Sequence, residues 1–362
     1  MRTLHHHVGQ LVVAGFDGYV VPTELRALVR EWDLGGVVLF GRNVEAAEQV
    51  AELAFAVEQL SQDVPLWVSV DQEGGRVARL RAPFTEWPPM ACLGRRGDSG
   101  LAERFAAALA DELCAVGITL DFAPVLDVHH PGADGVIGDR ALSSDPGEVG
   151  RMGAVIVETL QRNGIAACGK HFPGHGDARA DSHQELPVIE HPPERLREWD
   201  MAPFRAAVAA GVAGVMTAHI LYPALDPEQP ATLSRTIVRQ MLRDELGHQG
   251  LIVTDDLEMG AIAQTHTVER AAVAALAAGC DTLLLCGASV DRHASVLEAL
   301  IRAVEDKTLA VRTLEDALVR QRAVKARFLA GERPRRPLAG KALQSRLGTS
   351  AHRAVAEEMA LA

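Results

Sequence analysis

The chain has 362 residues, 48% of them hydrophobic, which is enough to bury the core of one large domain or of two ordinary ones. Its 36 basic and 48 acidic residues leave a formal net charge of −12, which disfavours nucleic acid and anionic membrane surfaces as partners. No run of about 18 apolar residues is present to span a bilayer, and we expect no secretory leader. The five cysteines are widely spread and form no CxxC pair. We therefore expect no disulfide framework and a cytoplasmic location.

Eight short apolar segments recur along the chain, each ending in glycine or a polar residue. They span residues 10–16, 35–43, 66–75, 118–127, 165–171, 212–219, 251–256 and 281–287. Their apolar residues are continuous rather than alternating, which predicts strands that are buried on both faces, as in a parallel sheet.

Helical patterns follow these segments. Residues 101–116 place Leu101, Phe105, Leu109 and Leu113 four positions apart, with Asp98 or Ser99 as N-cap and Gly117 as the stop. Similar patterns cover residues 44–60, 268–279 and 290–304.

This alternation predicts a single α/β domain, a (β/α)₈ TIM-type barrel over residues 1–335, followed by a helical tail over 336–362. A doubly wound open sheet is the alternative, but no GxGxxG motif follows an early strand.

Polar residues gather where the predicted strands end, which is where barrel enzymes carry their chemistry. These residues are Asp71, Asp127, Lys170, His171, His219, Asp255 and Asp256. One such residue can simply begin a loop, but five strand ends together indicate a site. In the segment VDQEGGRVARL, Asp71 with Arg76 and Arg79 forms a candidate clamp for ligand hydroxyls, because aspartate accepts and arginine donates hydrogen bonds. Arg140, in the polar loop segment GVIGDRAL, is a weaker candidate.

The segment KHFPGHGDARADSH, residues 170–183, contains three histidines, two aspartates and a lysine. A metal site is one interpretation, with ligands from His171, His175, Asp177, Asp181, His183, His219 and Asp255. Pro173 and Gly174 separate the first two histidines, however, so they do not form the i, i+4 pair of a helix. The early HxH motif of zinc-dependent barrel hydrolases is also absent.

An acid–base site is the other interpretation of this segment. Asp181 and His183 lie two positions apart, so on an extended loop they point the same way. The carboxylate would orient the imidazole and raise its basicity. Asp255, from a different strand, would then act as the nucleophile. We also expect the connection of residues 172–190 to be a mobile lid, with Gly174 and Gly176 as hinges.

Taken together, these segments resemble glycoside hydrolase family 3. The resemblance rests on KHFPGHGDARADSH and GLIVTDDLEM, together with VDQEGGRVARL, DFAPVLDV, VIGDRAL and VMTAHI in the same order, and it covers about residues 10–330. Within that family the chain is most similar to the single-domain bacterial β-N-acetylglucosaminidases of peptidoglycan recycling.

The resemblance implies that Asp255 is the nucleophile and that His183, assisted by Asp181, is the general acid/base. It further implies that the sugar is bound by Asp71, Arg79, Arg140, Lys170 and His171. The implied substrate is a small molecule, GlcNAc-anhydroMurNAc or its peptides, and no metal or organic cofactor is expected. We expect a monomer.

The implied reaction retains the anomeric configuration through a covalent glycosyl–aspartate intermediate. A histidine in place of the usual acidic carboxyl avoids repulsion with the ionised nucleophile. Phosphorolysis of the same sugars remains an alternative, since a neutral histidine tolerates an anionic acceptor. A non-catalytic sugar-binding barrel is a second alternative, although a binder needs neither Asp255 nor His183.

Overall fold

The computed structural model describes residues 2–62, 64–130, 132, 136–178, 180–182, 184–330 and 336–361. Within these residues eight parallel strands form a closed barrel in the order β1-β10-β9-β8-β7-β6-β3-β2. Their bounds are β1 (Val12–Ala14), β2 (Gly36–Leu39), β3 (Trp67–Val70), β6 (Leu120–Asp121), β7 (Ala166–Phe172), β8 (Gly214–Thr217), β9 (Leu251–Asp256) and β10 (Thr282–Leu285). Seven of them lie within the predicted segments and β7 extends one residue past its segment, so the barrel prediction is confirmed. The alternative of an open sheet is wrong, because β1 pairs with both β2 and β10.

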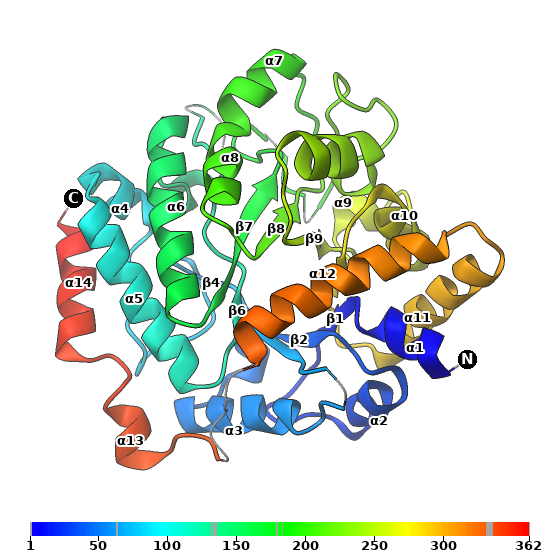
Figure 1. Cartoon of the computed structure of the whole chain (residues 1–362). Helices are drawn as coiled ribbons and strands as arrows, with labels where there is room; N and C mark the ends of the chain where they lie inside the picture. Colours follow the sequence, from blue (N-terminus) through cyan, green and yellow to red (C-terminus); the bar gives the residue numbers. More distant parts are fainter. Residues whose placement is uncertain are drawn as a thin grey trace.

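Helices surround the barrel (Figure 1). The longer helices are α2 (Thr23–Trp32), α3 (Ala47–Glu58), α5 (Ser99–Ala115), α6 (Pro146–Arg162), α8 (Ala202–Ala209), the π-helical η5 (Thr236–Glu245), α10 (Val268–Ala278), α11 (Val290–Glu305) and α12 (Val311–Leu329). The other helices are α1 (Arg2–Gly9), α4 (Met90–Arg96), α7 (Pro193–Arg195), the π-helical η3 (Leu196–Asp200) and α9 (Gly260–Ala263). Three single 3₁₀ turns are also described, η1 (Gly41–Asn43), η2 (Gly138–Arg140) and η4 (Ala231–Leu233). No helix in the described part of the chain is long and apolar enough to cross a membrane.

The helix α5 shows how the sequence pattern produces an element. The Asp98 side chain caps its start by accepting hydrogen bonds from the backbone N–H groups of Gly100 and Leu101. The predicted apolar positions, Phe105 and Leu109 among them, are buried against the barrel. The N-cap and the buried stripe therefore follow the prediction for this helix.

The two ends of the barrel differ in character. At the N-terminal ends of the strands, α12 packs Val324 and Leu329 into one apolar cluster with Trp67, Leu120 and Val253. This helix therefore closes that end with apolar contacts. At the C-terminal ends the barrel is open and polar. There, a short antiparallel hairpin of β4 (Gln72–Gly74) and β5 (Val77–Ala78) follows β3.

The C-terminal helix α14 (Ser350–Ala360) packs beside α4 and α5 (Figure 1), and the shorter α13 (Gly340–Gln344) precedes it. Glu112 of α5 is buried and binds this tail. Its Oε1 accepts from the backbone N–H of Gly348 at 2.8 Å and lies 3.0 Å from His352 Nδ1. The same carboxylate accepts hydrogen bonds from the backbone and the hydroxyl of Thr85. One buried glutamate therefore connects the tail to the barrel.

Candidate active site

A cavity of about 560 Å³ opens at the C-terminal ends of the barrel strands. Six of the predicted site residues line it, namely Asp71, Arg79, Arg140, Lys170, His171 and Asp255. They arrive from segments far apart in the sequence, after β3, on η2, on β7 and on β9. The structure therefore brings them to one place, as expected from their positions at strand ends.

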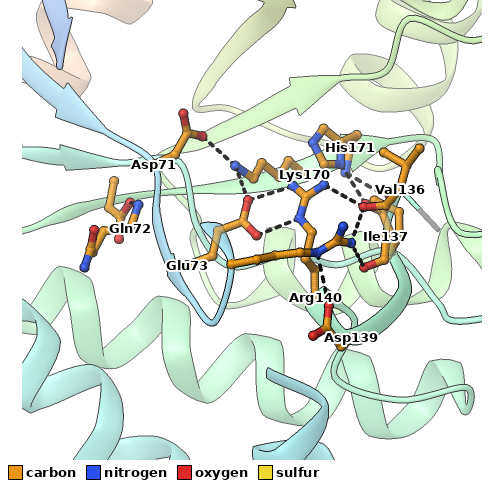
Figure 2. Close-up of polar contacts among 12 residues, drawn as sticks. Asp71, Gln72, Glu73, Val136, Ile137, Asp139, Arg140, Lys170 and His171 are labelled. Atoms are coloured by element: carbon orange, nitrogen blue, oxygen red, sulfur yellow. Dashed lines mark hydrogen bonds and ion pairs between the residues drawn. The ribbon is translucent and has the colours of Figure 1, made fainter. Parts of the chain in front are cut away.

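Lys170 lies at the centre of a chain of ion pairs (Figure 2). Its Nζ is 2.7 Å from Asp71 Oδ1 and 2.6 Å from Glu73 Oε1. On its other side, Glu73 accepts two hydrogen bonds from Arg140, at 2.8 Å from Nε and 2.7 Å from Nη2. Arg79 Nη2 approaches the second oxygen of Asp71 at 3.4 Å. Each charged side chain is thus held in position by the next.

The electrostatics of this chain keep its members ionised. Burial would raise the pKa of Glu73, but Lys170 and Arg140 outweigh it and lower that pKa to about 2. Burial would likewise lower the pKa of Lys170, yet Asp71 and Glu73 hold it above its usual value. An ammonium group has three N–H donors, and the two carboxylates take two of them. The third is available to a sugar hydroxyl, as is the polar edge of Asp71.

His171 is oriented from behind by Asp127. One carboxylate oxygen of Asp127 lies 2.7 Å from His171 Nδ1, and the other accepts from the backbone N–H groups of His171 and His175. Asp127 is fully buried, and its pKa is lowered because His171 and His175 outweigh the effect of burial. A carboxylate at Nδ1 keeps the proton on that nitrogen, which leaves Nε2 for a ligand in the cavity.

Asp255 ends β9 with its carboxyl group in the cavity. One of its oxygens accepts a hydrogen bond of 2.8 Å from the backbone N–H of Asp256. Although burial acts in the opposite direction, His219, His171 and Lys170 lower the pKa of Asp255. The side chain is therefore an ionised carboxylate at neutral pH, as a nucleophile must be.

Its neighbour Asp256 also borders the cavity, but its carboxyl group is occupied by the backbone. Oδ1 accepts hydrogen bonds from the N–H groups of Cys286 at 3.0 Å and Glu258 at 3.1 Å. Burial raises the pKa of Asp256 to about 6. Of the two adjacent aspartates, Asp255 is thus the one with the lowered pKa.

With this geometry in hand, comparison with known proteins identifies the family. The model of the glycosyl hydrolase family 3 N-terminal domain matches residues 3–324. The chain belongs to glycoside hydrolase family 3. A β-hexosaminidase of Alkalilimnicola ehrlichii is 40% identical over 301 residues, which cover 82% of this chain and 84% of that protein.

Two solved structures extend the comparison. A family 3 β-N-acetylglucosaminidase from Paenibacillus sp. str. FPU-7 superposes with a TM-score of 0.94 at 39% identity, over 98% of this chain and 68% of that one. NagZ from Neisseria gonorrhoeae, in complex with N-trifluoroacetyl-D-glucosamine, gives a TM-score of 0.79 at 32% identity, over 97% and 96% of the two chains. This family 3 enzyme is accordingly a glycoside hydrolase with β-N-acetylhexosaminidase activity.

The acid–base segment of the enzyme is only partly described. His183 lies outside the described residues, whereas Asp181 and Ser182 are placed. Ser182 is buried and borders the cavity, with its Oγ 3.2 Å from His175 Nε2. Its carbonyl oxygen accepts a hydrogen bond from the backbone N–H of Ala261. The residue between the two members of the predicted dyad therefore lies at the edge of the active site.

The expectation that Gly174 and Gly176 act as hinges is wrong. The Gly174 carbonyl accepts a hydrogen bond of 2.5 Å from the buried Tyr222 hydroxyl. A Cβ at Gly176 would lie 1.7 Å from the carbonyl oxygen of Val128. These glycines permit close packing of the chain, so this half of the connection is fixed beside the site.

The metal interpretation requires a cluster of ligands. Among the described residues, no group of three or more His, Cys, Asp or Glu side chains is arranged to hold an ion. Two of its candidate ligands have other partners. His171 pairs with Asp127, and His175 pairs with Ser182.

Glu73 and Glu258 border the cavity and were missed from the sequence. Glu258 accepts from the backbone N–H of Gly287 at 2.6 Å and from Arg292 at 2.8 Å. Both glutamates closely follow strands β3 and β9. The signal that would have found them is this position, one or two residues beyond an aspartate that was identified.

Proposed function

We propose that this enzyme removes N-acetylglucosamine from the non-reducing end of muropeptide fragments by a retaining mechanism, with Asp255 as the nucleophile. GlcNAc-anhydroMurNAc and its peptides are the substrates we infer. The observation that carries the proposal is the joint arrangement in one cavity of an ionised Asp255 and the chain of Asp71, Lys170, Glu73 and Arg140.

The first step forms the glycosyl–enzyme. An oxygen of Asp255 attacks the anomeric carbon, the bond from that carbon to the leaving oxygen breaks, and His183 donates a proton to that oxygen. The donors and acceptors around Lys170 fix the sugar so that its anomeric carbon faces Asp255. Asp181 orients His183, in the role that carboxylates have toward catalytic histidines.

The second step releases the sugar. His183, now neutral, removes a proton from a water molecule, whose oxygen attacks the anomeric carbon and displaces Asp255. Two inversions at that carbon give net retention. The histidine returns to its protonated form and the nucleophile to its carboxylate form.

The N-acetyl specificity draws support from relatives. The Neisseria structure was determined with an N-acetylglucosamine analogue bound, and the curated relatives are named β-hexosaminidases. All five cysteines of this chain are unpaired, which is consistent with the reducing cytoplasm that we propose as the site of action.

The deciding experiment compares hydrolysis of nitrophenyl β-N-acetylglucosaminide with that of the β-glucoside, and then tests GlcNAc-anhydroMurNAc itself. We expect preference for the N-acetyl sugar by at least about tenfold in kcat/KM. Equal turnover of both glycosides would disprove the specificity. Reactions with and without phosphate, analysed for free sugar against sugar 1-phosphate, separate hydrolysis from phosphorolysis.

A further inference from the structure

A second cavity, of about 530 Å³, lies at the end of the barrel opposite the active site. Its walls come from η5, from the C-terminal end of α10 and from the start of α12. Gly279 and Cys280, which border it, lie before the first residue of β10. Asp255 and Asp256, by contrast, are the last residues of β9. The cavity is therefore separate from the site described above.

Arginines dominate the lining of this cavity. They are Arg235, Arg239, Arg312 and Arg320. Asp244 and Asp316 are the acidic residues of the lining, so its formal charge is 4 − 2 = +2. The whole chain carries −12. A concave, positively charged site on a negatively charged protein favours binding of an anionic ligand.

Two of the arginines are held in place through one nitrogen only. Arg320 Nε lies 2.7 Å from Asp281 Oδ1, and Asp281 is itself buried and bound by Arg243. Arg239 Nε lies 3.2 Å from Asp244. In the described part of the chain, the hydrogen bonds of Arg239 and Arg320 run through Nε, and their terminal Nη atoms make none. These guanidinium groups are therefore held in one orientation, and their two Nη groups can donate hydrogen bonds to a ligand.

The other two arginines extend the same surface. Arg235 and Arg312 are exposed, and within the described residues neither makes a hydrogen bond or an ion pair. Arg312 belongs to the first turn of the 19-residue α12, whose N-cap residue, Ala310, provides no side-chain acceptor. The N–H groups of that turn add the positive end of a helix dipole to the cavity wall.

The buried His248 interacts electrostatically with two arginines of this region. The pKa of His248 is lowered to about 3 by burial and by the nearby charges of Arg243 and Arg320. His248 is buried with its Nε2 3.0 Å from the carbonyl oxygen of Leu251.

We propose that this cavity binds a small ligand carrying a phosphate group. Guanidinium groups recognise phosphate through paired N–H donors, and a fixed Nε contact leaves that pair free. The volume is in the range of sites for whole small molecules rather than single ions. It leaves room for a sugar or nucleoside attached to the phosphate. The Asp316 carboxylate can accept hydrogen bonds from the hydroxyls of that sugar or nucleoside. This site does not depend on the proposed muropeptide substrate.

Calorimetric titration of the full chain at constant ionic strength tests the proposal. The probes are glucose 6-phosphate, ADP and inorganic phosphate, with glucose and adenosine as uncharged counterparts. We expect saturable binding of at least one phosphorylated probe and none of its uncharged counterpart. The double variant Arg235→Gln/Arg312→Gln should weaken this binding at least about tenfold. Arg205→Gln, which removes an exposed helical arginine of α8 elsewhere on the barrel, should leave it unchanged.

Hydrolysis of the nitrophenyl substrate serves as the second measurement. The double variant should retain it, because the two arginines lie at the other end of the barrel, and retained activity shows that the variant is folded. Competitive inhibition by a phosphorylated probe, with equal binding in wild type and double variant, would place that probe in the active site and overturn the proposal. Absence of saturable binding by all three phosphates at about 10 mM would overturn it as well.

Discussion

His219 Nε2 lies 2.9 Å from the backbone carbonyl oxygen of Asp256, directly beside the nucleophile segment. The other ring nitrogen, Nδ1, lies 2.8 Å from Thr232 Oγ1. That hydroxyl also lies 3.0 Å from the carbonyl oxygen of Ala218, which can only accept its proton. When Thr232 donates to that carbonyl, both nitrogens of His219 act as donors. From this position the charge of His219 lowers the pKa of Asp255.

His219→Gln tests this relationship. Glutamine preserves a donor toward the Asp256 carbonyl but removes the positive charge, which is the largest of the effects that lower the pKa of Asp255. The pKa of Asp255 should therefore rise, and the acidic limb of kcat/KM should move to higher pH. The measurement is a pH–rate profile on a nitrophenyl substrate. A profile that merely drops at every pH, without moving, would assign His219 a packing role only.

The two adjacent aspartates should respond differently to substitution. Asp255→Ala removes the proposed nucleophile, so no glycosyl–enzyme should form and turnover should fall at least about 10³-fold, even with a good leaving group. Asp256→Asn keeps an oxygen that accepts from Cys286 and Glu258, and should retain activity within about tenfold. Mass spectrometry after reaction with a 5-fluoro sugar identifies the labelled residue. A label on Asp256 would reverse the assignment.

The variant Glu73→Gln tests the ion-pair chain by its effect on the free energy of unfolding. Folding lowers the pKa of Glu73 from 4.5 to about 2, so its contribution is fully present above pH 4.5 and is lost as the pH falls toward 2. Such a shift corresponds to at most about 3 kcal/mol. At pH 7 the variant should unfold at lower urea concentration than wild type, and the difference should shrink below pH 4.5. A difference that is constant with pH would contradict the ionic role.

Local sequence patterns were sufficient to predict the barrel, because each continuous apolar segment and the polar residue after it span only a few positions. Asp71, Lys170 and Asp255 could be predicted for this reason. Glu73 could not. A glutamate two residues into a loop normally faces solvent, and here it is buried only because Lys170 and Arg140 approach from β7 and η2.

The misjudged glycines have a related cause. A hinge and a close approach of two backbones both need a residue without Cβ, and the sequence does not distinguish them. Only the positions of Val128 and Asp200, distant in the sequence, show that Gly176 and Gly174 serve close packing.

The proposed acid–base dyad makes the most specific kinetic prediction. A sugar leaving group must be protonated as its bond breaks, whereas nitrophenolate leaves without a proton. Loss of a general acid typically reduces the rate by about 10²–10⁴. His183→Ala should therefore slow hydrolysis of GlcNAc-anhydroMurNAc severely but leave the first step on the nitrophenyl substrate nearly intact. A rapid burst of nitrophenol should precede slow turnover, because the intermediate lacks a base to activate water.

Azide separates this role from a purely structural one, since it attacks the anomeric carbon without needing a base. Adding it should accelerate the slow phase of His183→Ala and yield the β-configured glycosyl azide, as two inversions require. Asp181→Ala, which retains the imidazole but loses its orienting carboxylate, should show a smaller burst and a weaker azide effect. Ser182→Ala is the matched control between them, because it removes only a hydroxyl that contacts His175. If His183→Ala slowed both leaving groups equally and azide had no effect, the histidine would bind or position the substrate, and another residue would have to supply the proton.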